Sequence, residues 1–352
     1  SQPRRRQRRR AWLWAGAATV AVVAAGLAGA LLARRGAESP ALRLRPLTAR
    51  RGIVYTARFD PGGTAVYYSA AWDGGPSRIY VTRPGSGASA EIAVPGSVRL
   101  LSVSRRGELA LLLDLPLASV FGASAVATLA VAPATGGPPR RLVDLVRGAD
   151  WGPDGESLAV VRVVKTPGGD RRRLEYPVGR VLVESQPDSY FCISSPRVSP
   201  RGDRIAFVDC EPTTGAVEIR TVDLEGHQQR HYRGPPYGPQ SESVWGLSWS
   251  PAGEEIWFAL KQEGRLADLV AVDLRGRLRR LGTLGGGLLD VSSSGEALAS
   301  VHSRRGCIVV HRSDEAAERE LGCGEYPLGL AGSHNFTLSL DGRFILRGET
   351  LG

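Results

Sequence analysis

One short phrase recurs seven times along this chain of 352 residues, and this repeat constrains the fold more than any other feature. Each copy runs from a short apolar stretch, through a turn with a fixed Gly, into a second apolar stretch, as in DWGPDGESLAVV from Asp150 and RVSPRGDRIAFV from Arg197. The turn glycines are Gly63, Gly107, Gly155, Gly202, Gly253, Gly295 and Gly342. They are separated by 44, 48, 47, 51, 42 and 47 residues, a narrow spread that chance does not produce.

Each phrase is typical of two antiparallel strands joined by a tight turn, where Gly adopts a backbone conformation that other residues resist. Two further strands per unit are expected between the phrases, for example at 78–82 and 91–94 after the first copy and at 269–273 and 278–281 after the fifth. Four strands in a repeat of roughly 40 to 50 residues describe one blade of a β-propeller. The sequence therefore predicts an all-β propeller with seven repeat motifs and six to seven four-stranded blades, in which the glycines have a structural role.

The two ends of the propeller region predict how its ring closes. Residues 42–48, LRLRPLT, resemble the ends of other blades, such as LRRLGT from Leu278, and we expect them to supply the outer strand of the last blade. Such an exchange leaves no exposed sheet edge. Only six residues follow Leu346, so we expect the last blade to be incomplete.

An uncharged stretch of 23 residues, 11–33, precedes the repeats. At 1.5 Å per residue, a helix of this length exceeds the roughly 30 Å thickness of the hydrocarbon layer. Trp12 and Trp14 lie where an interfacial aromatic belt is expected, and the basic segment 1–10 favours the cytoplasm. We therefore expect a transmembrane helix at 11–33, a linker at 34–41 and a propeller at 42–352, in a single-pass protein of the inner membrane with the propeller outside the cytoplasm.

Two alternatives concern this apolar segment. It could be a cleaved signal peptide, although it is longer than the usual apolar core of about 7 to 15 residues. Ala25, Gly29 and Ala33 have the spacing that lets two helices pack closely, which allows a dimer through this segment, but an Ala-rich helix has this spacing by composition alone.

The net charge of +10 suggests nucleic-acid binding until its location is considered. Residues 1–51 hold 12 Arg and one acidic residue, which leaves 33 basic and 34 acidic residues in 52–352. Because the propeller is nearly neutral and has no basic run interleaved with aromatic residues, we expect it to bind no nucleic acid.

The chain has four cysteines, at 192, 210, 307 and 323. Cys192 and Cys210 are symmetric about the turn of the fourth phrase, and Cys307 and Cys323 are symmetric about Glu315 between two predicted strands. Residues opposed across an antiparallel hairpin are close enough for a disulfide, so we predict the bridges Cys192–Cys210 and Cys307–Cys323, with buried reduced thiols as the alternative.

The sequence contains no nucleophile elbow, phosphate-binding loop or kinase motif. His227 and His231 are four residues apart, but they lie on a turn-rich segment without the helix that would bring them together, so we expect no zinc site there. We therefore predict no catalytic, metal or cofactor site in this chain. Trp72, Asp73 and Tyr176 lie on predicted connections, where propellers often bind partners, and are candidate surface contacts, although for Trp72 and Tyr176 packing is the favoured interpretation. The sequence does not identify a protein or small-molecule ligand.

GPDG from Gly152 and SPRG from Ser199 resemble the WD-type repeats of TolB-like propellers, and the resemblance covers most of the chain. The segment LTARRGIVYTARFDPGGTAVYYSAAWDGGPSRIYVTRPG, with DWGPDGESLAVVR and RLEYPVGRVL, is similar to the extracytoplasmic propellers of bacterial transmembrane serine/threonine protein kinases. This resemblance implies a sensory or protein-binding ectodomain, with a kinase domain upstream of Ser1. Alternatives are a TolB-like envelope scaffold, the ectodomain of a membrane-bound winged-helix transcription regulator, and a propeller that gates a peptidase.

Overall fold

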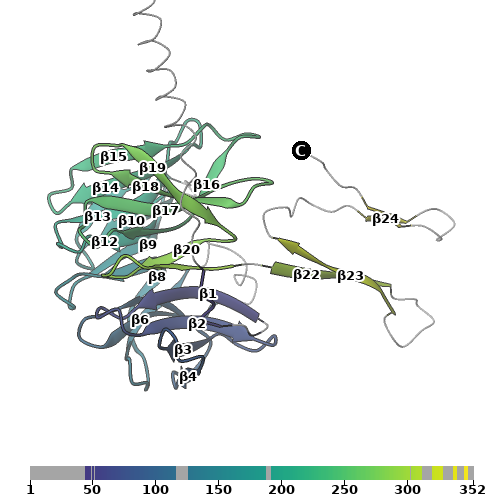
Figure 1. Cartoon of the computed structure of the whole chain (residues 1–352). Coiled ribbons are helices and arrows are strands. Elements are labelled where there is room, and N and C mark those ends of the chain that lie inside the picture. The colour runs from purple at the N-terminus through teal and green to yellow at the C-terminus, as the bar shows by residue number, and fades with distance from the viewer. Residues whose placement is uncertain are drawn as a thin grey trace, which may run out of the picture. The chain divides into compact units, whose positions relative to one another are not determined.

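A computed structural model describes residues 44–48, 50, 52–115, 126–187 and 192–301, and, as backbone alone, the strands 303–310, 319–327, 336–338 and 345–347 (Figure 1). The predicted segments 1–10, 11–33 and 34–41 lie outside the described residues, so their boundaries stay predictions. In the part of the chain that is described, no helix is both long and apolar enough to cross a membrane.

The repeats form antiparallel sheets in chain order. The first sheet contains β1 (Gly52–Phe59), β2 (Val66–Trp72), β3 (Arg78–Thr82) and β4 (Ser89–Ile92). Two further four-stranded sheets contain β12 (Ser194–Val198), β13 (Arg204–Cys210), β14 (Val217–Asp223) and β15 (Gln228–Arg233), and then β16 (Glu242–Trp249), β17 (Glu255–Gln262), β18 (Ala267–Asp273) and β19 (Leu278–Leu284). These three sheets are the four-stranded blades that the repeat predicts.

Between the first sheet and these two lies a continuous sheet of seven strands. It contains β5 (Val98–Val103), β6 (Glu108–Leu113), β7 (Ala127–Pro133), β8 (Arg140–Trp151), β9 (Leu158–Thr166), β10 (Gly169–Glu175) and β11 (Val181–Glu184). The long strand β8 pairs with β7 through its first half and with β9 through its second half. It is therefore both the outer strand of one blade and the inner strand of the next.

The remaining strands form two-stranded sheets. They are β20 (Leu288–Val291) with β21 (Ala297–Ala299), β22 (Ser303–Val310) with β23 (Arg319–Pro327), and β24 (Phe336–Leu338) with β25 (Ile345–Arg347). The hairpin of β24 and β25 is the seventh repeat motif, and Gly342 in its turn lies outside the described residues.

The first strands of the first six motifs, β1, β5, β8, β12, β16 and β20, are the inner strands. Each contacts the next in chain order, and β20 contacts β1, so they form a closed ring around one axis. The backbone N–H of Phe59 donates to Asp290 at 3.0 Å, across the contact between the first and sixth motifs. The described ring therefore has six members, and the hairpin of β24 and β25 does not lie between β20 and β1.

The predicted ring closure by residues 42–48 is wrong for the part of this segment that the structure describes. Residues 44–48 form no strand, and Leu47 instead packs against an apolar cluster that combines the first blade with Leu298 and Leu289 of the sixth motif. Leu47 is therefore part of the packing between these two motifs and not of an outer strand. The six described turn glycines have φ between 69° and 86°, the left-handed region that favours Gly.

The core consists of apolar side chains between neighbouring blades. Phe207 and Phe258 are fully buried, and Trp249, on β16, donates its indole Nε1–H to the carbonyl oxygen of Arg197 on β12 at 2.9 Å. Truncation of a buried Phe to Ala typically costs about 3–5 kcal/mol. The blade faces therefore supply much of the stability of the ring.

The four cysteines lie on two hairpins. A disulfide joins Cys192 to Cys210, whose Cα atoms are 4.8 Å apart. Cys307 and Cys323 are partners in the backbone register of β22 and β23, and their side chains lie outside the described residues. The second bridge therefore stays a prediction.

Candidate functional site around the propeller axis

Six side chains occupy the same position on the six inner strands, two residues before the first residue of each turn. We call them the polar ring: Arg58, Ser102, Asp150, Arg197, Ser248 and Asp290. In chain order they read Arg–Ser–Asp twice, so the first three blades and the last three present equivalent residues. Each of the six inner strands has a β-bulge or other register irregularity. A bulge re-aims the side chains next to it, which allows polar groups to meet near the axis.

The two aspartates of the polar ring make equivalent contacts. Asp150 accepts hydrogen bonds from the Ser102 hydroxyl at 2.6 Å and from the backbone N–H of Val198 at 2.9 Å. Its counterpart Asp290 accepts from the Ser248 hydroxyl at 3.2 Å and from the backbone N–H of Phe59. Each carboxylate therefore links the preceding blade to the following one.

The two arginines of the polar ring lie between these carboxylates. Arg197 pairs with Asp290 and lies 3.6 Å from Asp150. Arg58 donates to the carbonyl oxygens of Leu101, at 2.8 Å, and of Leu289. The two guanidinium groups and two carboxylates balance in formal charge.

The electrostatics of the two arginines differ. Burial, together with the charge of Arg197, lowers the pKa of Arg58 to about 10. Burial also acts to lower the pKa of Arg197, but Asp290 and Asp150 outweigh it, and the pKa of Arg197 is raised overall. Arg197 is thus the cation that the two carboxylates stabilise, whereas Arg58 relies on backbone carbonyl groups.

A second set of six positions lies three residues earlier, five on the same strands and the sixth directly before β20. We call it the arginine layer: Tyr55, Arg99, Arg147, Ser194, Trp245 and Gly287. It contains two arginines and no acidic residue. The guanidinium carbon of Arg99 lies 4.9 Å from the centre of the Tyr55 ring, and the Arg99 Nε is buried without a hydrogen bond. Burial lowers the pKa of both Arg99 and Arg147.

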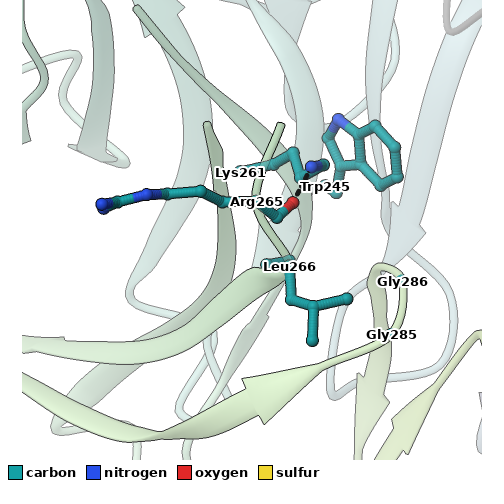
Figure 2. Close-up of a pocket in the computed structure, with 7 residues that line it drawn as sticks. Trp245, Lys261, Arg265, Leu266, Gly285 and Gly286 are labelled. Carbon is teal, nitrogen blue, oxygen red and sulfur yellow. Dashed lines mark hydrogen bonds between the residues drawn. The ribbon is translucent and has the colours of Figure 1, made fainter. Parts of the chain in front are cut away.

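A small recess adjoins the arginine layer at Trp245 (Figure 2). Besides Trp245, the residues that line it are Lys261, Arg265, Leu266, Ala267, Gly285 and Gly286. The Lys261 ammonium lies 5.9 Å from the centre of the Trp245 ring and donates to the carbonyl oxygen of Arg265. The side chain of Leu266 is half exposed, at 52%. Cationic and aromatic groups thus extend from the axis to the surface between the fifth and sixth motifs.

The surface contacts expected from the sequence are located elsewhere. Trp72 is buried among Tyr68 and Tyr80, with the guanidinium of Arg50 5.1 Å from its ring centre. Asp73 is exposed and lies 3.7 Å from Arg50. These contacts favour the packing interpretation for Trp72.

Tyr176 is buried in the apolar cluster between the third and fourth blades, and burial raises the pKa of its phenol. Its position also favours packing over contact with a ligand. The structure does not bring Tyr176 together with Trp72 and Asp73, which belong to the first blade.

Sequence reasoning missed the polar ring, although a signal was present. In six phrases the same position holds Arg, Ser or Asp, followed at once by an aromatic residue or Val: RF, SV, DW, RV, SW and DV. A charged residue or Ser beside an apolar one in six predicted inner strands could have indicated a buried polar set. The sequence alone does not show that all six positions converge on one axis.

Two groups of possible metal-binding side chains lie close together in the described residues. One contains Cys192, Asp209 and Cys210, whose sulfur atoms form the disulfide. The other contains the exposed or half-exposed Asp223, Glu225 and His227, where His227 pairs with Asp223. His231 is buried and its Nε2 lies 2.9 Å from the Thr221 hydroxyl, so it is part of a separate contact.

Comparison with solved structures identifies the architecture. A protein from Agrobacterium tumefaciens assigned as TolB has 17% sequence identity and a TM-score of 0.54, over 73% of this chain and 92% of that one. TolB from Acinetobacter baumannii has 16% identity and a TM-score of 0.49, over 70% of this chain and 58% of that one. The tricorn protease has 15% identity and a TM-score of 0.47, over 75% of this chain and 24% of that one.

No family model and no curated protein matches this sequence. The class that the sheets and the ring of inner strands define is the β-propeller. More narrowly, the fold of this chain is TolB-like.

Proposed function

We propose that this chain is the extracytoplasmic, ligand-binding or protein-binding propeller of a membrane signalling receptor, with its effector, a serine/threonine protein kinase domain, upstream of Ser1. The observation that carries the proposal is the Cys192–Cys210 disulfide on the β12–β13 hairpin. Disulfides form and persist outside the reducing cytoplasm. The bridge supports a propeller that folds on the outer side of the membrane.

Two further observations support a binding role. A TolB-like propeller presents loops and an axis on a rigid scaffold, and such scaffolds commonly bind partners. The charged groups of the polar ring are engaged with one another and with backbone groups, so they link blades rather than perform chemistry. The propeller would report its bound state to the effector through the predicted helix at 11–33.

The location is tested by labelling cysteine variants in intact cells with a membrane-impermeant maleimide. Tyr237 is 83% exposed, and Tyr237→Cys should be labelled in intact cells. The control Gln7→Cys lies in the predicted cytoplasmic segment and should be labelled only after lysis. The parent chain gives the background from the native cysteines. Labelling of Tyr237→Cys only after lysis would reject the proposed location.

The signalling role is tested by deletion of residues 52–352 from the full-length gene product and measurement of effector output across growth conditions. A sensory propeller predicts an output that no longer responds to conditions. An output that responds as in the wild type would reject the sensory role and leave a TolB-like envelope scaffold as the better account.

A further inference from the structure

We propose that the arginine layer binds a small oxyanion, the carboxylate or phosphate group of a ligand, with Arg99 as the principal contact. This inference deepens the proposed binding function by naming the chemistry of the ligand. It rests on the state of Arg99, on the charge of the layer and on the contrast with the polar ring.

Arg99 is a partly buried cation that has no carboxylate partner among the described residues. Its one specific contact is the stack on Tyr55, and its Nε is buried without a hydrogen bond. A buried charge without a partner is costly and is usually paired or bound to a ligand. A guanidinium group can donate two parallel hydrogen bonds to a carboxylate or phosphate, and the buried Nε of Arg99 is one of the donors that such a group could engage.

The charge of the arginine layer also favours an anion. Arg99 and Arg147 occupy equivalent positions on β5 and β8, which contact each other. Burial lowers the pKa of Arg99, and an anion beside its guanidinium would stabilise the charged form. Lys261 and Arg265 add cationic side chains at the adjoining recess beside Trp245 (Figure 2).

The polar ring is less suited to this role, because two carboxylates flank Arg197 and backbone carbonyl groups accept from Arg58. Asp150 and Asp290 both lie against Arg197, and the ring has no net formal charge. The polar ring also lies nearer to the turns, whereas the arginine layer lies nearer to the starts of the inner strands. A ligand is therefore expected to approach from the side on which the inner strands begin.

Two glycines on this side, Gly246 and Gly287, lie where the fifth and sixth inner strands approach each other. A Cβ added to Gly246 would lie 1.6 Å from the carbonyl oxygen of Leu288, and one added to Gly287 would lie 2.7 Å from that of Trp245. The fifth and sixth inner strands thus approach each other closely by backbone. Long side chains at this level come from Tyr55, Arg99, Arg147 and Trp245, which would surround the anion with aromatic and cationic groups.

The test is calorimetric titration of the full chain, in mild detergent at low salt, with inorganic phosphate and with citrate as separate probes. The wild type should bind at least one probe saturably, and the tighter one identifies phosphate or carboxylate as the preferred group. Arg99→Met should weaken that binding by at least tenfold. The matched control Arg201→Met removes an exposed arginine from a repeat turn and should leave the affinity unchanged.

Arg99→Lys keeps the charge but removes the planar fork, so it should weaken binding by several-fold and provides a second variant if Arg99→Met does not fold. Binding that is equal in the wild type and in the folded Arg99 variants would overturn the proposal, as would the lack of saturable binding of either probe. The readout is direct binding, so its failure leaves the location and signalling tests of the receptor proposal untouched.

Discussion

The polar ring and the arginine layer lie three residues apart along the six inner strands, but they differ in how a buried arginine is compensated. In the polar ring, Arg197 lies between two carboxylates that also accept hydrogen bonds from backbone and hydroxyl groups. In the arginine layer, the contact found for Arg99 within the described residues is an aromatic ring. The first set therefore links the blades, whereas the second fits the proposed anion site.

The largest effect is expected from Asp290→Asn. The substitution keeps the shape but removes the charge that pairs with Arg197, and leaves two buried arginines with one carboxylate. Breaking a buried ion pair typically costs about 3–5 kcal/mol, and urea unfolding should show a loss of this size. The control Asp268→Asn breaks a half-exposed pair with Arg280 and should cost at most about 1 kcal/mol. Equal losses in the two variants would remove the distinction between the polar ring and an ordinary surface pair.

A smaller effect is expected from Ser102→Ala. The Ser102 hydroxyl donates to Asp150 at 2.6 Å and accepts from the backbone N–H of Trp151 at 3.2 Å, so its removal leaves a buried donor and a buried acceptor short of partners. The expected loss is about 1–3 kcal/mol in the free energy of unfolding.

Ser248→Ala is the matched variant in the other half of the polar ring. The Ser248 hydroxyl donates to Asp290 at 3.2 Å and accepts from the Arg197 guanidinium at 3.2 Å, and no backbone N–H bond to it is found in the described residues. Asp290 and Arg197 also pair directly with each other, so both keep a partner when the hydroxyl is removed. Its removal should cost about 0.5–1.5 kcal/mol. A larger loss in the free energy of unfolding for Ser248→Ala than for Ser102→Ala would contradict this ranking of the two hydroxyl groups.

The smallest effect is expected in the acid sensitivity of the fold, and it concerns His231, a buried residue outside the polar ring. Burial lowers the pKa of His231 in the folded chain below its ordinary value of 6.5, so below that pH the unfolded chain binds more protons. His231 should therefore make stability fall as the pH drops below 6.5, by at most about 1.4 kcal/mol per pH unit. Urea unfolding at pH 7.5 and 5.5 should show a smaller decrease for His231→Gln than for the wild type. An unchanged decrease would show that His231 does not contribute to the acid sensitivity of the fold.

Much of the fold could be predicted from the sequence because the information is local. The turn glycines and the alternating apolar residues define each hairpin within about a dozen positions, and the symmetry of Cys192 and Cys210 about one turn follows from the same register. Packing was the favoured interpretation for Trp72 and Tyr176, but the side chains that they pack against could not be predicted, because both were placed on connections between strands. Their burial depends on neighbouring blades, which a single repeat does not reveal.

The closure of the ring and the candidate site depend on contacts between motifs far apart in the chain. Seven phrases suggested up to seven blades, but the contact of β1 with β20 depends on how the described blades pack in three dimensions. The Arg, Ser and Asp residues of the polar ring can be recognised when the phrases are aligned. Which of these charged side chains contact each other depends on how the ring closes. Arg58 and Asp290, for example, are in adjacent motifs only once the ring is formed.

The most direct test of the contrast between the two layers is the unfolding free energy of Arg197→Met against that of Arg99→Met, without added anion. Arg197→Met leaves two buried carboxylates without their shared cation and should lose about 3–5 kcal/mol. Arg99→Met removes a buried charge and loses one cation–π contact, so its stability should stay within about 1 kcal/mol of the wild type. Losses of equal size in the two variants would contradict the account, because Arg99 would then be as necessary to the fold as Arg197.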